Sequence, residues 1–166
     1  MTIRDRLRSR QRPTTSYPMR VADTQDAERE LLEAQAAYRR ASRLGGPDSP
    51  EARDAKTRVE QAEEALRGCY VDIKLVALPP DELEALIAQH PPREGVDDGP
   101  VNAETYPRAL FLACVDAEGM TREDWEYVLD HTCSYGERQE LYLLAQALNT
   151  RGPSTALPKG WTLTRR

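Results

Sequence analysis

The stretch "TQDAERELLEAQAAYRRASRL", residues 24–44, gives the clearest structural signal, because it predicts a helix with one narrow apolar seam. Its apolar side chains recur at steps of four and three, with charged residues elsewhere. The stretch "SPEARDAKTRVEQAEEALRGC", residues 49–69, repeats this pattern. The two seams consist of Ala27, Leu31, Ala34, Tyr38 and Ala41, and of Ala52, Ala55, Val59, Ala62, Leu66 and Cys69.

The segment that joins these helices predicts a tight reversal of the chain. It reads "GGPDSP", in which the two glycines can end the first helix. Ser49 can cap the second helix, and Pro50 fits its first turn. We therefore predict an antiparallel helical hairpin over residues 21–68. Because its seams are rich in alanine, it buries little apolar surface and depends on the rest of the chain or on a partner.

Composition limits the function classes that the chain can serve. Of its 166 residues 31% are charged and 6% aromatic, and the mean hydropathy is -0.70, which argues against a large buried active-site cavity. The longest apolar run, Ala109 to Val115, is far below the roughly 20 residues that cross a bilayer. We expect a cytosolic protein without membrane association. Three cysteines without a CxxC pair argue against a disulfide framework.

Charge is divided unevenly along the sequence. Residues 1–20 carry six arginines against one aspartate, a net charge of +5, so the remainder carries -10 of the formal total of -5. With Pro13 and Pro18 and few apolar residues, this segment predicts a basic flexible arm. Arginines can bind phosphates, but an acidic body repels a polyanion and no aromatic side chain is interleaved to stack on bases. This disfavours nucleic acid as the partner.

Alternating hydrophobicity predicts one short strand over residues 69–78. In "CYVDIKLVAL", Val71, Ile73 and Leu75 point to one side and the polar residues mostly to the other. One strand cannot satisfy its own backbone donors. Either a segment near Tyr17 to Val21 pairs with it, or another chain does and the strand is an interaction edge.

Residues 79–149 predict a small bundle of four short helices that holds most of the core. Capping signals mark the helix starts, including Thr121 with Asp124 and Ser134 with Glu137. Residues 150–166 remain as a C-terminal tail. The predicted fold class is mainly α: a helical hairpin and a small bundle of short helices, with one short β-strand between them.

The stretch "QHPPREGVDDGPVNAETYPRALFLACV", residues 89–115, gathers the residue types from which metal sites and hydrolytic centres are made. Each has a structural explanation, because His90 ends a helix, Asp98 lies in a turn and Glu104 precedes a helix start. The pair His131 and Cys133 lacks two further zinc ligands at suitable spacing. No GxSxG, Walker A, HExxH or GxGxxG motif is present. We expect no enzyme activity, cofactor or metal.

A succession of motifs over residues 20–150 resembles a known family. "LPPDELEALIAQHPP", "DDGPVNAETYPRALFLACV", "MTREDWEYVLD" and "GERQELYLLAQALN" follow a charged hairpin. In this order they resemble the tail assembly chaperones of long-tailed, siphovirus-like phages and prophages of actinobacteria. The resemblance implies a non-catalytic protein of the host cytoplasm that binds the tape measure protein, helps to recruit tail tube subunits and is absent from the mature virion.

Two other functions remain open at this stage. The same features suit a structural tail completion or connector protein of the virion, and a helical regulator that uses its N-terminal arginines on nucleic acid. The resemblance also implies a longer product made by a programmed -1 frameshift, for which Leu157, Pro158 and Lys159 can be encoded by a slippery sequence. That longer form, and further copies of this chain, are additional candidate partners. The candidate partner-binding residues are Arg4, Arg6, Arg8, Leu31, Tyr38, Val59, Ile73, Leu75 and Trp161.

Overall fold

The computed structural model describes residues 2–116 and 119–150. The chain divides into two compact units, which we name the hairpin unit, Tyr17–Ile73, and the bundle unit, Met1–Ser16 with Lys74–Arg166. The elements are α1 (Ile3–Arg8), β1 (Thr14–Arg20), α2 (Gln25–Gly45), α3 (Pro50–Arg67), β2 (Tyr70–Val76), α4 (Pro80–Gln89), α5 (Tyr106–Cys114), α6 (Arg122–Tyr127), η1 (Val128–Thr132) and α7 (Tyr135–Thr150). The mainly α fold class is confirmed.

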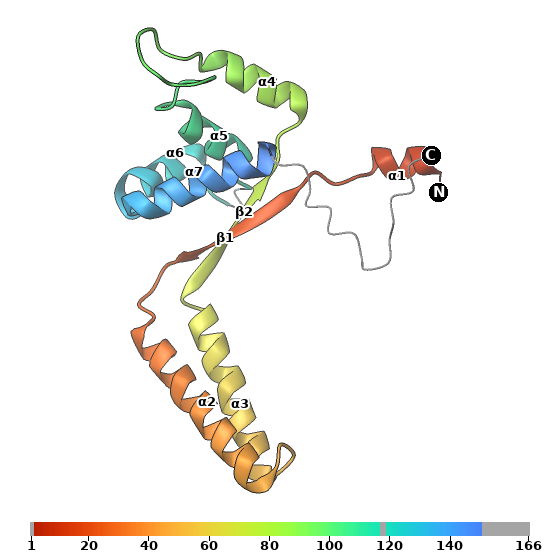
Figure 1. Cartoon of the computed structure of the whole chain (residues 1–166), viewed down its shortest axis with the longest axis vertical. Helices are drawn as coiled ribbons and strands as arrows, with labels where there is room; N and C mark the ends of the chain where they lie inside the picture. The colour runs from red at the N-terminus through yellow and green to blue at the C-terminus, as the bar shows by residue number, and fades with distance from the viewer. Residues whose placement is uncertain (1, 117–118, 151–166) are drawn as a thin grey trace. The chain divides into compact units, whose positions relative to one another are not determined.

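The predicted helical hairpin is confirmed as α2 and α3, which lie side by side in the hairpin unit (Figure 1). Gly46 ends α2 with a positive φ of 86°, a conformation that favours glycine. Ser49 caps α3 by accepting a hydrogen bond from the Ala52 amide at 3.2 Å. Pro50 occupies the first turn, as the sequence indicates.

The hairpin seam is built mainly from alanine. Its buried members are Ala34 on α2 and Ala52, Ala55 and Ala62 on α3. An ion pair between Arg58 and Glu30, 3.1 Å apart, joins the two helices at the exposed edge of the seam. The small side chains allow close packing but bury little apolar surface, as predicted.

The predicted strand is confirmed as β2, and β1 pairs with it in a two-stranded antiparallel sheet. Backbone hydrogen bonds extend the pairing at both ends, from Val21 N–H to Cys69 O and from Ala77 N–H to Pro13 O, both 2.9 Å. Of the two pairings considered, the one inside the chain is present. The prediction of a single strand is therefore corrected to two.

The prediction of a flexible arm over residues 1–20 is wrong for most of that segment. Thr14–Arg20 forms β1, and Ile3–Arg8 forms α1, whose N-terminus carries a capping box between Thr2 and Asp5. Strand pairing satisfies backbone groups that an isolated arm leaves to water, so a partner strand orders a segment with little apolar content of its own.

The bundle unit holds the four predicted helical segments, α4, α5, α6 with η1, and α7 (Figure 1). The capping box between Thr121 and Asp124 starts α6. Reciprocal bonds between Ser134 and Glu137 start α7, at 2.8 and 3.3 Å. The turn of π-helix at η1, which follows α6 directly, is not predicted from the sequence. Helix α7 spans Tyr135–Thr150.

The core of the bundle unit lies where α5, α6, η1 and α7 meet the end of β2. Phe111 is fully buried and meets Trp125 edge to face, with ring centroids 5.7 Å apart. Leu75 of β2 is also fully buried and forms an isolated antiparallel bridge with Val115. The other buried residues of this unit are Ala77, Tyr106, Leu110, Cys114, Leu129, Leu141 and Ala145.

The helices within residues 2–116 and 119–150 include none that is long and apolar enough to cross a bilayer.

Candidate interaction surface

The stretch between α4 and α5 brings its charged and polar side chains together as a turn. Arg93 donates to Asp98 at 2.7 Å and to Glu104 at 2.6 Å through its two terminal nitrogens. The Arg93 backbone amide also donates to Asp98, at 2.9 Å. His90 shares a hydrogen bond of 2.8 Å with the Thr105 hydroxyl. These contacts join residues within the segment between α4 and α5, which we name the α4–α5 connector, residues 90–105, to one another.

Asp98 is the most perturbed carboxyl group of this connector. Its side chain is 1% exposed, and the hydrogen bonds from Arg93 hold the pKa of the Asp98 carboxyl well below its usual range, against the opposing effect of desolvation. A carboxylate held ionised by a neighbouring guanidinium is a poor general acid or base at neutral pH. The geometry therefore supports the structural interpretation of this stretch.

Cys114, the remaining reactive group of the same stretch, belongs to the core. Its thiol is buried, and burial raises the pKa of that thiol, while a hydrogen bond from the Asn149 amide acts in the opposite direction. The Asn149 Nδ2 donates to Cys114 Sγ at 3.1 Å, and its Oδ1 accepts from the Leu78 amide at 2.9 Å. Asn149 thus joins the end of α7 to α5 and to the residue after β2.

The described part of the chain lacks a set of side-chain ligands of the kind that metal ions need. There, no group of three or more His, Cys, Asp or Glu side chains is placed to hold a metal ion. His131 instead packs against Tyr127, with ring centroids 4.8 Å apart.

The structure separates the predicted partner-binding residues into three groups. Ile73 and Leu75 are buried, with 8% and 0% exposed, so they cannot serve as an open edge, and this part of the prediction is corrected. Leu31, Tyr38 and Val59 are half-buried in the hairpin, and Arg4, Arg6 and Arg8 are exposed on or at the end of α1. Trp161 lies outside the described residues, as does the Leu157 to Lys159 segment.

A surface that the sequence analysis did not single out lies on α2, on the side away from the seam. We name it the α2 outer face. Leu32 and Leu44 are 65% and 81% exposed on it, although both are large and apolar. An open hollow lies at its C-terminal end. The face comprises Leu32, Ala36, Arg39, Arg40, Arg43 and Leu44.

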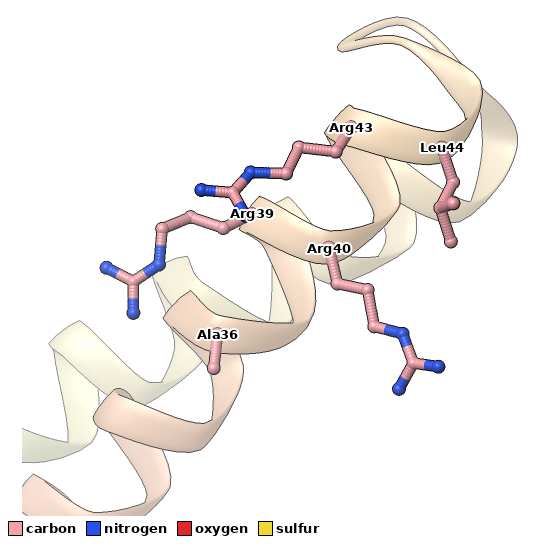
Figure 2. Close-up of a pocket in the computed structure, with 5 residues that line it drawn as sticks. All are labelled: Ala36, Arg39, Arg40, Arg43 and Leu44. Carbon is pink, nitrogen blue, oxygen red and sulfur yellow. The ribbon is translucent and has the colours of Figure 1, made fainter.

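Figure 2 shows how the side chains of this hollow lie. Arg39 and Arg43 extend to one side of α2, while Arg40 and Leu44 extend to the other, with Ala36 one turn before them. The short side chain at Ala36 leaves space between the two rows. The result is a small, open surface on which the apolar side chains of Ala36 and Leu44 lie among three guanidinium groups.

These arginines differ from three others of the hairpin unit, which form ion pairs. Arg29 pairs with Asp26, Arg58 with Glu30 and Arg67 with Glu64. By contrast, no side chain of the described residues forms an ion pair or hydrogen bond with Arg39, Arg40 or Arg43. Their charges stand at the C-terminal end of α2, where the helix dipole favours cations. The α2 outer face is therefore free to bind an anionic group.

The sequence contains a signal for this face. Arg39, Arg40 and Arg43 fall off the alanine seam, and such positions are usually assigned to solvent. Within residues 39–43 all three charged residues are arginines, and leucines lie before and after them. Elsewhere in the hairpin, acidic and basic residues are mixed.

Comparison with known proteins adds nothing to this description. Neither a family model, nor a curated protein sequence, nor a solved structure matches the chain. The fold defines a mainly α protein with a two-stranded antiparallel sheet, and the family resemblance of its motifs stays a prediction.

Proposed function

We propose that this chain is a non-catalytic tail assembly chaperone of a long-tailed phage or prophage. It binds the tape measure protein and helps to recruit tail tube subunits in the host cytoplasm, and it is absent from the finished virion. The order of the motifs across residues 20–150 supports this function. The observation that carries it is the α2 outer face, which offers a partner both apolar side chains and unpaired guanidinium groups.

The chemistry of the α2 outer face suits an elongated helical partner. Exposed leucines can bury apolar residues that recur along one side of a partner helix. The arginines next to them can pair with the acidic residues that flank such a stripe, which sets register and orientation. A chaperone that keeps a long, striped protein from self-association needs a surface of this kind and no reacting group.

The side chains with catalytic potential are used for structure, which supports a non-catalytic role. Arg93, Asp98 and Glu104 form one closed network, and His90 bonds to Thr105. Cys114 is buried beside Asn149.

Co-expression with the tape measure protein of the same genome tests the proposal. The native chain is expected to keep the tape measure protein soluble and to co-purify with it. Arg40→Glu with Arg43→Glu should weaken both effects. Arg53→Glu with Lys56→Glu is the matched control, because it makes the same charge change on exposed positions of α3. A tape measure protein that stays soluble without this chain would contradict the proposal.

Two further measurements separate the rival functions. Mass spectrometry of purified particles should not detect the chain, whereas a connector protein would be found there. Binding to duplex DNA should be absent at physiological salt, whereas a nucleic-acid regulator would bind with an affinity that falls steeply as salt rises.

A further inference from the structure

The chain itself contains an acidic helix that matches the α2 outer face. Helix α4 carries Asp81, Glu82 and Glu84, has no basic residue and has no buried residue. None of these carboxylates is in an ion pair with any residue that the structure describes. The molecule thus has unpaired acidic groups on one helix, α4, and unpaired basic groups on another, α2.

The two sides of α4 differ in character. Leu83 and Leu86 are half-buried, and α4 contacts α5. At about 100° per residue, Asp81, Glu84 and Ala88 project from a different side of the helix, and all three are exposed. This exposed stripe combines two carboxylates with a small apolar residue.

The spacings of the two stripes match when one helix is reversed. On the α2 outer face, Arg40 and Arg43 follow Ala36 by four and seven residues. On α4, Glu84 and Asp81 precede Ala88 by four and seven residues. Positions with this spacing lie on one side of a helix. An antiparallel pair therefore brings each arginine opposite a carboxylate in a single register.

We propose that α4 of a second copy of this chain packs antiparallel on the α2 outer face. In this register Arg43 lies opposite Asp81, and Arg40 lies opposite Glu84. Charge complementarity favours this contact, because the two stripes carry opposite charges at equal intervals. The proposal does not depend on the identity of any phage protein.

The backbone favours the same orientation. Ala36 and Ala88 meet in this register, and small residues at a crossing allow two helices to approach closely. The antiparallel arrangement also places the N-terminus of α4 beside the C-terminus of α2, so that opposite ends of the two helix dipoles are neighbours.

Each copy has one α2 outer face and one α4, which limits the assemblies that can form. If each of two copies packs its α4 on the α2 outer face of the other, they form a closed dimer with two equivalent contacts. If the contacts are not reciprocal, the copies form an open chain. Both assemblies depend on protein concentration and weaken as salt screens the ion pairs. An α2 outer face covered in this way becomes accessible to another helix after the copies separate.

Sedimentation velocity of the full chain tests the contact. The native chain should show a mass above that of a monomer that rises with concentration and falls with added salt. Arg40→Glu with Arg43→Glu should weaken self-association by about tenfold or more, since two attractive pairs become repulsive. Asp81→Lys with Glu84→Lys should have the same effect. Arg53→Glu with Lys56→Glu is the control and should leave the association constant within about twofold.

Mixing the two charge-reversed variants provides the decisive measurement. Each variant alone has like charges at the contact, whereas an equimolar mixture restores opposite charges at both contacts of a mixed dimer. The mixture should therefore regain the native association constant, while circular dichroism shows that each variant is folded. A native chain that is monomeric at every concentration, or a mixture that stays monomeric, overturns the proposal. The proposal is also overturned by one further result for the chain that carries all four substitutions, at Arg40, Arg43, Asp81 and Glu84. If that chain has native stability but stays monomeric, the charge pairs form within one chain and not between copies.

Discussion

Replacing Asn149 with leucine tests how the end of α7 is held to the rest of the bundle unit. The side chain makes three hydrogen bonds, from Leu78 N–H at 2.9 Å, to Cys114 Sγ at 3.1 Å and to Ala145 O at 2.8 Å. The bond from Leu78 fixes the orientation of the Asn149 amide, because a backbone N–H can donate to the Oδ1 atom but not to the NH₂ group. Leucine has a similar volume but can replace none of these bonds.

The expected cost follows from what the substitution leaves unpaired. Loss of a neutral hydrogen bond costs about 0.5–1.5 kcal/mol, and a buried donor left without an acceptor costs about 1–3 kcal/mol. Leu78 is half-buried, so water can partly replace the lost acceptor. The weak acceptor at Cys114 Sγ contributes least. We expect Asn149→Leu to lower the free energy of unfolding of the bundle unit by about 2 kcal/mol.

Tryptophan fluorescence during urea unfolding provides the assay. The sequence has two tryptophans, so a Trp161→Phe background leaves Trp125, which is buried in the bundle unit, as the only reporter. The matched control is Thr150→Ala, which removes an exposed hydroxyl that bonds to Gln146 O at 2.8 Å in the same turn. That change should stay within about 0.5 kcal/mol. Equal unfolding midpoints for Asn149→Leu and Thr150→Ala would contradict this stabilising role of Asn149.

Three shorter predictions concern separate parts of the chain. Ser49→Ala should lower the stability of the hairpin by about 1 kcal/mol through loss of the N-cap, as measured by circular dichroism, whereas Ser49→Asp should not. Phe111→Ala should cost about 3–5 kcal/mol and change the fluorescence of Trp125, which its ring contacts. Arg93→Met should raise the pKa of Asp98 toward its ordinary value in an NMR titration. In the native chain that folded-state pKa is lowered, so the stabilisation is present above about pH 4 and is lost as pH falls through the lowered value.

The hairpin could be predicted from the sequence because local signals agree there. The alanine seam has the helical period, Gly46 and Ser49 mark the reversal, and both helices satisfy their own backbone groups. The starts of α6 and α7 were equally predictable, since a capping box is a local pattern of two residues.

The parts that the sequence did not predict depend on contacts between distant segments. β1 contains Pro18 and lacks a strong alternating pattern, and it becomes a strand because β2 lies beside it. The burial of Ile73 and Leu75 has the same cause, since a periodic pattern assigns residues to a face but cannot say what covers that face. The α2 outer face is not predicted, because arginines that lie off the apolar seam of a helix are most often solvated.

Among the described residues, no ion pair or hydrogen bond holds the arginines of that face in place. Arg43 is four residues from Arg39 and three from Arg40, and like charges at these spacings destabilise a helix by about 0.2–0.5 kcal/mol per pair. The dipole at the C-terminus of α2 offsets this by about 0.3–1 kcal/mol per cation. The two effects nearly cancel, so Arg43→Gln should change hairpin unfolding by less than about 0.5 kcal/mol.

Self-association should respond differently to the same substitution. Arg43→Gln removes one of the two ion pairs proposed at each contact between copies, so the dissociation constant measured by sedimentation should rise about two- to fivefold. An unchanged hairpin together with weaker association means that Arg43 acts in binding. If Arg43→Gln instead lowered hairpin stability and association in parallel, the arginine would be a structural residue of α2, and the case for a binding role of the α2 outer face would fail.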